Sequence, residues 1–399
     1  MDRFARGSAA GFGDSARSRP LHVAIISGGW PPETFIDRLV RGLRAAGTEI
    51  TFVSSAPPPQ TYMADLRASW IPGPDRPNSR AMARLVLRSA SPTDAGNRLR
   101  GMLRTTLDGD PVAGSGADVL YVPWINSLTA DLDIFELGIP VVTSCRGSLV
   151  TVAPWNPRRH AHRDALRTVF ERSAAVHCVS ESIAADAARW GLRDEKVRII
   201  RPAIDPDSFP VRTGNATGAL RAVAVGNLGL AKNYEHAIRA VGIARDLGFD
   251  VELRIVGKGP DSQHLRYTID DLGLVDCVQL LGPISADGVG ALLRDSDVFL
   301  HTSFTEGISN AVLEAMATAL PVVTTDAGGM AEAVRDGVDG FVVPVRSPEI
   351  TARRLGDLAS DPGLRRRFGD SGRERVERHF RLADQIESFT TLFHEVAGR

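Results

Sequence analysis

The chain has 399 residues, of which 43% are hydrophobic and only 6% aromatic. This length and composition predict an α/β protein of two or three domains with sizeable hydrophobic cores, and they exclude a chain that is disordered throughout. The formal net charge of −1 gives no general attraction to nucleic acid or to an anionic membrane, so we expect no nucleic-acid partner.

Cysteine usage and hydropathy indicate the compartment. The three cysteines, Cys145, Cys178 and Cys277, are too few and too scattered for a disulfide framework or a zinc site. No stretch approaches the roughly eighteen apolar residues that cross a bilayer, and residues 1–20 carry arginines without the apolar core of a secretory signal. We therefore expect a flexible N-terminal arm over residues 1–20 and a cytoplasmic location.

Strand and helix patterns alternate from residue 21 onward. Such alternation is typical of parallel sheets whose strands are joined by helices. In the N-terminal half, strands are expected at residues 22–27, 49–53, 118–122, 139–144, 175–179 and 197–200, and helices at 34–46 and from about residues 129, 158 and 181. Residues 54–116 are rich in proline and arginine, and only one helix, at 80–90, is expected there.

A break in composition follows the first set of strands. Residues 202–218 contain three prolines and two glycines, which indicates a linker. The alternation then restarts, with strands expected at 222–225, 251–256, 278–281, 297–302 and 321–325. We therefore expect two doubly wound Rossmann-like domains, at residues 21–203 and 219–380, joined by a linker at 204–218. In such sheets, ligands bind at the carboxyl ends of the strands.

Two glutamates flank a predicted loop and the start of a helix. The loop follows an apolar run typical of a buried strand, and Ser309 is placed to cap the helix that follows. The free N–H groups of Ile308, Ser309 and Asn310 would face outward at the positive end of the helix dipole, where phosphate binds. Glu306 lies just before this anion site, and Glu314 lies one turn into the helix, on the same face as Asn310. One carboxylate can reach a sugar and the other a ribose, which indicates a sugar-nucleotide site.

Three loops that contain glycine follow predicted strands. Gly28 and Gly29 allow the backbone to approach a ligand closely, although a tight turn before two prolines also explains them. The loop from Gly226 to Tyr234 contains Lys232, and lysine is rare in this chain, at three of the 47 basic residues. The third loop contains Gly257 and is a weak signal alone. The spacing of the glycines matches neither the Rossmann fingerprint nor the P-loop, which argues against a dehydrogenase or a P-loop enzyme. Lys232 is expected to face a phosphate.

Other catalytic motifs do not occur in the sequence. It has no His-rich metal motif and no Gly-x-Ser-x-Gly elbow, so we expect neither a metal site nor a serine hydrolase. His177 and His301 lie in apolar strands and are expected to be buried, hydrogen-bonded structural residues. The predicted helix from Arg158 to Arg172 carries a basic cluster that could dock at the inner face of the plasma membrane, although such faces are more often merely solvated. The predominance of arginine suggests a bacterial genome rich in G and C.

These segments together resemble the retaining glycosyltransferases of family 4. The most specific part is the two-glutamate motif from Glu306 to Glu314 with the strand and turn at 320–330, and similar segments lie at 30–36, 179–183, 204–209, 226–233 and 278–283. The resemblance covers about residue 21 to the C-terminus. It implies the α/β GT-B fold, in which an N-terminal acceptor domain and a C-terminal donor domain, both Rossmann-like with parallel sheets, face each other across a cleft. It also implies that a C-terminal helix, at about 381–399, packs back on the N-terminal domain.

The resemblance implies a role for each residue of the donor site. Glu306 would hold hydroxyl groups of the donor sugar, Glu314 the ribose and Lys232 the diphosphate, while the amides of Gly307 to Ser309 would bind phosphate oxygens. The complete expected donor set is Gly28 and Gly29 at the diphosphate, Leu281, Gly282 and Pro283 at the nucleobase, and Asn227, Lys232, Gly257, Glu306, Gly307, Ile308, Ser309, Asn310 and Glu314.

Two positions depart from the family pattern. Asn227 stands where the family often has a diphosphate-binding arginine, and Arg146 stands where it often has the histidine of a His-Gly pair. Arg146 is expected either to place its charge near the leaving phosphate or the acceptor, or to pair with a structural carboxylate. We expect Lys232, Glu306 and Arg146 to be the catalytic residues. The expected acceptor residues are Trp30, Glu33, Thr34, Arg146 and Ser148.

The resemblance implies a retaining glycosyltransferase that moves a sugar from a nucleoside-diphosphate sugar, most often a UDP or GDP sugar, to an acceptor hydroxyl, with no permanently bound cofactor and no metal. The acceptor would be a glycan, a lipid-linked sugar or a small natural product. Transfer in this family is thought to run on one face of the sugar, so stabilisation of charge on the departing phosphate would be the main contribution of the protein. Two alternatives share the architecture: a sugar-nucleotide 2-epimerase, which needs no acceptor, and a non-catalytic homologue that binds a sugar nucleotide.

Overall fold

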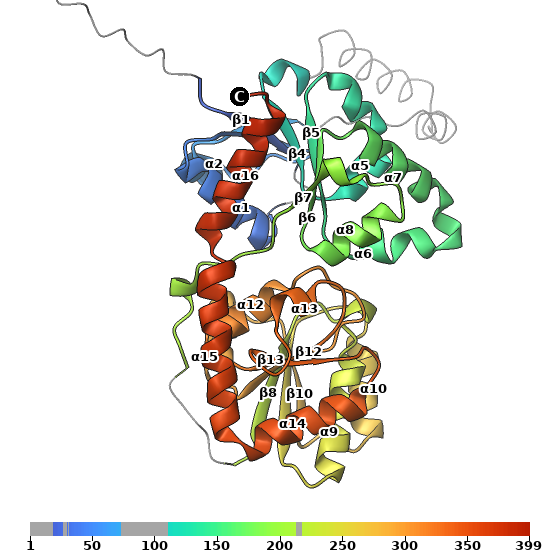
Figure 1. Cartoon of the computed structure of the whole chain (residues 1–399), viewed down its shortest axis with the longest axis vertical. Helices are drawn as coiled ribbons and strands as arrows, with labels where there is room; N and C mark the ends of the chain where they lie inside the picture. The colour runs from blue at the N-terminus through green and yellow to red at the C-terminus, as the bar shows by residue number, and fades with distance from the viewer. Residues whose placement is uncertain (1–18, 27–29, 31, 73–110, 213–217) are drawn as a thin grey trace, which may run out of the picture.

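The computed structural model describes residues 19–26, 30, 32–72, 111–212 and 218–399, with only the backbone described for Arg159. Within these residues the strands form two separate sheets, of seven and six strands, and helices pack on both (Figure 1). Every strand pair in the two sheets is parallel. The predicted α/β fold of two doubly wound domains is thereby confirmed. The helix expected at 80–90, most of the expected arm, and Gly28 and Gly29 lie outside the described residues.

The sheet of the N-terminal domain has the strand order β3-β2-β1-β4-β5-β6-β7. Its central strands are buried along their whole length, as expected of strands covered on both faces. The strands are β1 (His22–Ile26), β2 (Glu49–Ser54), β3 (Ser69–Pro72), β4 (Val119–Val122), β5 (Val141–Cys145), β6 (Ala175–Cys178) and β7 (Val197–Ile199). The helices are α1 (Thr34–Ala45), α2 (Gln60–Leu66), α5 (Ile125–Ala130), α6 (Ser148–Thr151), α7 (His160–Arg172) and α8 (Glu181–Ala188).

Two parts of this domain differ from the sequence-based expectation. The helix expected from about residue 129 lies earlier, at Ile125–Ala130, because Asp131 adopts an extended backbone that ends it. The Asp131 carboxylate then accepts a hydrogen bond from the Asp133 N–H, which starts a 3-10 helix at Leu132–Leu137. Helix α2 and strand β3 were not expected at all, and both lie in the segment whose pattern was least informative.

The sheet of the C-terminal domain has the order β10-β9-β8-β11-β12-β13. Its strands are β8 (Leu220–Val225), β9 (Val251–Val256), β10 (Val278–Gly282), β11 (Val298–His301), β12 (Val322–Thr325) and β13 (Gly340–Val343). Its helices are α9 (Tyr234–Asp246), α10 (Ser262–Asp271), α11 (Ala286–Arg294), α12 (Asn310–Ala317), α13 (Met330–Ala333), α14 (Pro348–Ser360) and α15 (Pro362–His379). All five expected strands occur, and β13 is the additional one.

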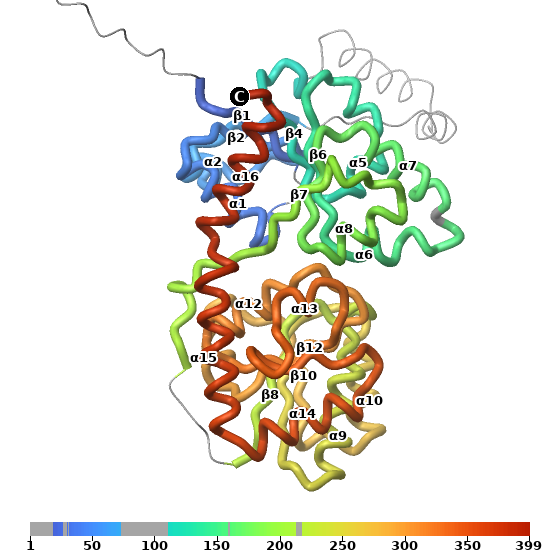
Figure 2. The backbone as a smooth tube through the Cα atoms, viewed as in Figure 1, coloured from blue at the N-terminus to red at the C-terminus, as the bar shows by residue number. Residues whose placement is uncertain are grey.

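Helix α16 (Leu382–Val396) follows α15 and returns to the first domain, where it packs beside α1 (Figures 1 and 2). Phe389 and Phe393 belong to the same buried cluster as Leu39 of α1 and Tyr121 of β4. The ring of Phe389 lies edge-on to that of Tyr121, with centroids 5.6 Å apart. The chain therefore crosses between the domains twice, and the crossings lie side by side, because Ile204 pairs with Arg381 in a short parallel bridge.

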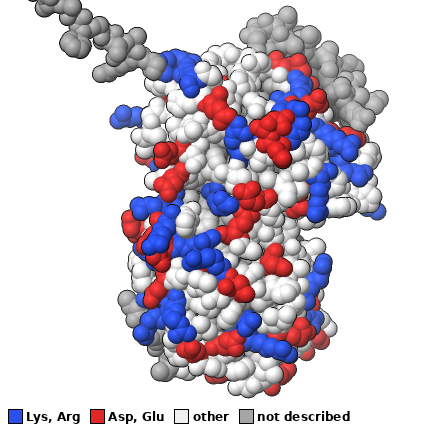
Figure 3. Space-filling model, in the orientation of Figure 1, with Lys and Arg blue, Asp and Glu red and all other residues white. Residues whose placement is uncertain are grey.

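The surface and the hydropathy of the described residues are ordinary. Acidic and basic side chains are interspersed over the face that Figure 3 shows. No helix in the described part of the chain is long and apolar enough to span a membrane.

Removal of the Phe389 side chain is expected to destabilise the N-terminal domain. The residue is 1% exposed, so Phe389→Ala should lower the free energy of unfolding by about 3–5 kcal/mol, the range for truncation of a buried phenylalanine. Urea unfolding followed by circular dichroism measures this, with Glu387→Ala, exposed on the same helix, as the control. Equal stability of the two variants would contradict the packing of α16 described above.

Candidate functional site

Lys232 and Glu306 meet where two loops leave the carboxyl ends of neighbouring strands. The Lys232 ammonium group forms an ion pair with Glu306 Oε2, and the two side chains are 23% and 18% exposed. Lys232 ends a short 3-10 helix after β8, and Asn233 adopts the left-handed backbone that asparagine tolerates. The Glu306 loop is fixed to this turn, because the Phe304 N–H donates to the Ala231 carbonyl (2.8 Å). The two residues that the sequence placed in one site are therefore in direct contact.

The groups around Glu306 lower the pKa of its carboxyl group. Burial alone would raise the pKa of Glu306, but the charge of Lys232 and hydrogen bonds from His301 and Lys232 lower it to about 2. Burial lowers the pKa of His301, whose Nε2 lies 3.2 Å from Ser303 Oγ and 3.4 Å from Glu306 Oε2. His301 is thus a buried, hydrogen-bonded residue as expected, and it also contacts the site. His177 is likewise buried and bonded to Ser144 and to the Ile200 carbonyl.

The start of helix α12 lies directly after the Glu306 loop. Ser309 occupies the N-cap position, but its side chain accepts no hydrogen bond from the first turn, so the expected side-chain cap is wrong. Within the described residues, the N–H groups of Ile308, Ser309 and Asn310 have no hydrogen-bond partner. Unpaired N–H groups at the positive end of a helix favour an anion. The expected phosphate position therefore keeps its donors available.

Two further glycine positions, Gly257 and Gly282, adjoin the lysine loop. The Gly257 N–H donates to the Gly282 carbonyl (3.0 Å), and a Cβ atom on Gly257, at φ 146°, would lie 1.8 Å from the Gly226 oxygen. Gly257, Gly282 and Gly226 lie at the carboxyl ends of β9, β10 and β8, and these three strands are adjacent in the sheet. Asn227, Gly257 and the segment Leu281, Gly282 and Pro283 thus form one continuous edge that leads to Lys232. Leu281 is exposed on this edge.

Arg146 lies in the N-terminal domain, in the loop between β5 and α6. Its guanidinium group stacks over the Phe35 ring at 3.9 Å and donates to the Tyr121 hydroxyl (3.2 Å) and the Pro123 carbonyl (3.3 Å). It has no carboxylate partner among the described residues, so the structure does not support the alternative of a structural ion pair. Ser148, which begins α6, follows it closely in this loop.

The Arg146 loop packs directly on the Glu306 loop of the other domain. A Cβ atom on Gly307 would lie 2.5 Å from both the Arg146 carbonyl oxygen and Val179 Cγ2, so only glycine permits this approach. Beside it, the Thr151 and Thr305 hydroxyls are 2.8 Å apart. The Glu306 loop, which also contacts Lys232, and the Arg146 loop are therefore brought together at the junction of the two domains.

Two interdomain ion pairs were not foreseen from the sequence. Arg38 of α1 donates to Glu314 of α12 at 3.0 Å. Glu332 of α13 accepts from the Ser182 N–H at the start of α8 (3.0 Å) and from Arg201 (2.9 Å). In each pair the two residues are more than 130 positions apart in the sequence, and no local sequence pattern predicts such contacts.

The remaining expected acceptor residues lie near the start of α1. The Trp30 indole packs edge-on against Phe52 and Tyr62 and donates to Ser54 Oγ (3.3 Å), so its ring is engaged by the core of the N-terminal domain. Glu33 is the N-cap residue of α1, and Thr34 is its first residue. Gly28 and Gly29 lie outside the described residues.

Two arginines of the basic helix α7 are paired with carboxylates. Arg167 lies 4.0 Å from Asp164, and Arg172 pairs with Glu136 at 2.8 Å. Its apolar side faces inward, with Leu166, Val169 and other residues buried.

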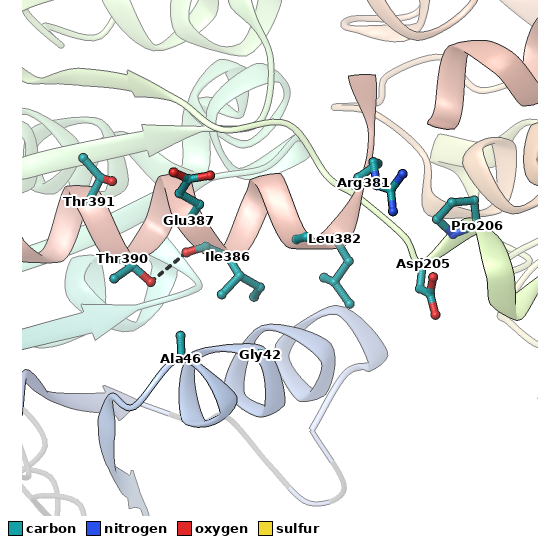
Figure 4. Close-up of a pocket in the computed structure, with 11 residues that line it drawn as sticks. Gly42, Ala46, Asp205, Pro206, Arg381, Leu382, Ile386, Glu387, Thr390 and Thr391 are labelled. Atoms are coloured by element: carbon teal, nitrogen blue, oxygen red, sulfur yellow. Dashed lines mark hydrogen bonds between the residues drawn. The ribbon is translucent and has the colours of Figure 1, made fainter. Parts of the chain in front are cut away.

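One cavity of the described part of the chain lies away from these loops. It has a volume of about 610 Å³ and lies between α1, α16 and the first crossing segment (Figure 4). Gly42, Ile386, Thr390, Pro206 and Arg381 are among its lining residues, and none of the expected site residues lines it. Within the described ranges, no group of three or more His, Cys, Asp or Glu side chains could hold a metal ion.

The fold and the junction of the two domains, together with sequence profiles, define the class of protein. Two sequence profiles match in succession: residues 32–208 match the profile described as Glycosyltransferase Family 4, and residues 207–375 match the one described as Glycosyl transferases group 1. The chain belongs to the glycosyltransferases of the GT-B fold.

Individual proteins are similar in sequence to parts of this chain. The chain is 32% identical over 198 residues to the putative colanic acid biosynthesis glycosyltransferase WcaL of Salmonella typhimurium, a match that covers 48% of this chain and 49% of WcaL. It is 27% identical over 288 residues to the MMP alpha-(1->4)-mannosyltransferase of Mycolicibacterium hassiacum, covering 68% of this chain and 69% of that enzyme. The chain thus aligns with about half the length of the first of these relatives.

Solved structures share the whole fold. HepE of Anabaena, solved in complex with UDP and glucose, superposes with a TM-score of 0.72 over 94% of this chain and 100% of HepE, at 16% identity. The sucrose-phosphate synthase of Thermosynechococcus elongatus gives a TM-score of 0.73 over 95% of this chain and 99% of that protein, at 17% identity.

The lowered pKa of Glu306 predicts a specific dependence of stability on pH. Because the folded-state pKa is below the usual value of 4.5, the ionised carboxylate contributes stability above about pH 4.5 that is lost as the pH falls towards 2. The difference in unfolding free energy between the wild type and Glu306→Gln should therefore shrink below about pH 4.5, by up to about 3 kcal/mol. Urea unfolding at a series of pH values measures it. A difference that stays constant down to the acid limit of the native state would show that Lys232 does not hold the charge of Glu306.

Proposed function

We propose that this protein is a retaining glycosyltransferase that moves a sugar from a nucleoside-diphosphate sugar to an acceptor hydroxyl. The observation that carries the proposal is the contact between Lys232 and Glu306 beside the unpaired N–H groups at the start of α12. A cation and three amide donors converge on a position for phosphate groups, and a carboxylate lies next to them for sugar hydroxyls.

Donor binding would exchange the partners of the ion pair. The diphosphate would take over the charge of Lys232 and accept hydrogen bonds from the amides of Ile308 to Asn310. Glu306, released from Lys232, would accept hydrogen bonds from the sugar. The edge formed by Asn227, Gly257 and residues 281–283 would hold the nucleoside, with Glu314 at the ribose.

The charge on the leaving diphosphate is then stabilised by groups that are already in position. Lys232 and the α12 amides are fixed before the reaction, so they need not reorganise as negative charge develops. Arg146 lies across the junction and would place a second cation on the same phosphate or orient the acceptor. The departing phosphate would take the proton of the acceptor hydroxyl on the face from which it leaves.

We infer a UDP sugar as the first donor to test and a growing polysaccharide as the first acceptor. HepE was solved with UDP and with UDP-glucose, and WcaL is assigned to colanic acid biosynthesis. The N-terminal domain would bind the acceptor, because the loop that carries Arg146 and Ser148 packs on the Glu306 loop from that side.

Nucleotide binding is expected to depend on Lys232. UDP, GDP, ADP, CMP and dTDP and their common sugar conjugates are compared by thermal shift, with the wild type beside Lys232→Ala. A ligand at about a hundred times its dissociation constant adds roughly 2.7 kcal/mol to the folded state. One nucleotide should stabilise the wild type and fail to stabilise the variant. The donor site would be refuted if no nucleotide stabilised the wild type.

Turnover is expected to fall more than binding alone explains. With saturating donor, Lys232→Ala should reduce the rate of acceptor-dependent nucleotide release roughly a hundredfold, the scale for loss of one preorganised charge-stabilising group. Lys258→Ala is the matched control, because Lys258 lies exposed in the next glycine loop. A loss of tenfold or less at Lys232 would remove it from catalysis. Nucleotide release without any acceptor would indicate hydrolysis, and conversion of the sugar nucleotide without net release would indicate an epimerase.

A further inference from the structure

Helix α1 of the N-terminal domain reaches the donor side of the molecule through one side chain. Arg38 donates a hydrogen bond to Glu314 Oε1 at 3.0 Å, across 276 residues of sequence. The two side chains are 24% and 19% exposed, so the pair is partly withdrawn from water. It joins the domain that holds Arg146 to the helix whose first turn offers the expected phosphate donors.

Arg38 stands on a rigid support. One face of α1 is buried through Ile36, Leu39, Val40 and Leu43. A Cβ atom on Gly42 would lie 2.3 Å from Ile386 Cδ1, so α16 packs against the helix at that point (Figure 4). Phe35, one turn before Leu39, supports the Arg146 guanidinium. The same turn of helix thus carries Arg38 and supports the side chain of Arg146.

The carboxylate of Glu314 keeps capacity for a second partner. Arg38 bonds only to Oε1, and Oε2 accepts no hydrogen bond from the described part of the chain. An ionised carboxylate has about four lone-pair positions on its two oxygens. It can therefore accept one bond from Arg38 and still accept bonds from two neighbouring hydroxyl groups, the arrangement that a ribose diol presents.

We propose that Arg38 is a positioning residue for recognition of the donor's ribose. By holding the Glu314 carboxylate fixed in orientation, it lets the N-terminal domain set how strongly the C-terminal domain distinguishes ribose from deoxyribose. The proposal rests on the proposed function, in which Glu314 accepts the ribose hydroxyls. It goes beyond that function by assigning a specificity role to a residue of the opposite domain.

Two other roles for the pair make different predictions. A pair that only linked the domains would contribute to stability and leave the preference for ribose unchanged. A pair that blocked Glu314 in the free protein would compete with the ribose, so its removal would tighten nucleotide binding.

The experiment compares ribose and deoxyribose nucleotides. Dissociation constants for UDP, 2′-deoxy-UDP, GDP and 2′-deoxy-GDP are measured by isothermal titration calorimetry on the wild type, Arg38→Ala, Arg38→Lys and Arg41→Ala. The wild type should prefer the ribose form of its nucleotide by roughly tenfold or more, as for a hydrogen bond to a charged group. Arg38→Ala should reduce that preference to about threefold or less, through weaker binding of the ribose form, and Arg38→Lys should restore part of it.

Arg41→Ala is the matched control. Arg41 lies on the same helix, but it pairs with Asp37 (3.0 Å) and Asp65 (2.6 Å) within its own domain. This variant should keep the preference of the wild type. Thermal melts without nucleotide establish that each variant is folded, and Arg38→Gln replaces Arg38→Ala if the alanine variant is not.

The outcomes separate the two proposals. If the wild type prefers ribose and Arg38→Ala keeps that preference, or binds the ribose form more tightly, the role of Arg38 is overturned while the donor site stands. If the wild type binds neither UDP nor GDP, or binds ribose and deoxyribose forms equally, the ribose role of Glu314 fails, and the role of Arg38 fails with it.

Discussion

Lys232 and Glu306 are both mostly withdrawn from water, and each can keep its charge there because it faces the other. A single buried charge would be neutralised or would pull water into the junction, since the cost of removing an ion from water is several kcal/mol. The pair therefore fixes the Lys232 turn and the Glu306 loop relative to each other. The loop that carries Glu306 also carries Gly307, so the contact between the two domains depends on the same interaction.

Part of the domain junction is built from closely packed backbone. Gly307 and Gly329 pack against Arg146, Val179 and Ser180 at distances that exclude any Cβ atom. Peptide groups from both domains thus approach each other directly, and polar contacts such as the one between Thr151 and Thr305 lie around them.

Sequence reasoning located the site because of a regular property of parallel sheets. The loops that follow β8, β9, β10 and β11 all leave the same edge, so the order of the strands brings Lys232 to Glu306 without any knowledge of side-chain packing. Each of these strands is a run of apolar residues that periodicity identifies, which is also why the two domains could be predicted. The 3-10 turn at Asp131 and the short elements α2 and β3 lacked such a signal, because each depends on local hydrogen bonds or tertiary support.

The contacts between domains could not be predicted for a different reason. The partners of Arg38 and Glu332 depend on how two rigid bodies are placed, and periodicity within one element carries no information on that placement. Trp30 is a related case, because it was expected as an acceptor residue and no pattern in the sequence predicted that its ring packs against Phe52 and Tyr62. Arg146 was identified as a site residue, but its support by the Phe35 ring became apparent only in three dimensions.

The side-by-side crossings at Ile204 and Arg381 have a consequence for synthesis of the protein. The core of the N-terminal domain includes Phe389 and Phe393, which the ribosome adds only after the entire C-terminal domain. The C-terminal domain can therefore bury its own core first, while the apolar surface of α1 and Tyr121 that α16 later covers stays exposed. Domains usually fold in the order of their synthesis, and exposed apolar surface makes a nascent chain prone to aggregation. This topology reverses that order, so a chain interrupted before α16 leaves the ribosome with one folded domain and one that lacks part of its core.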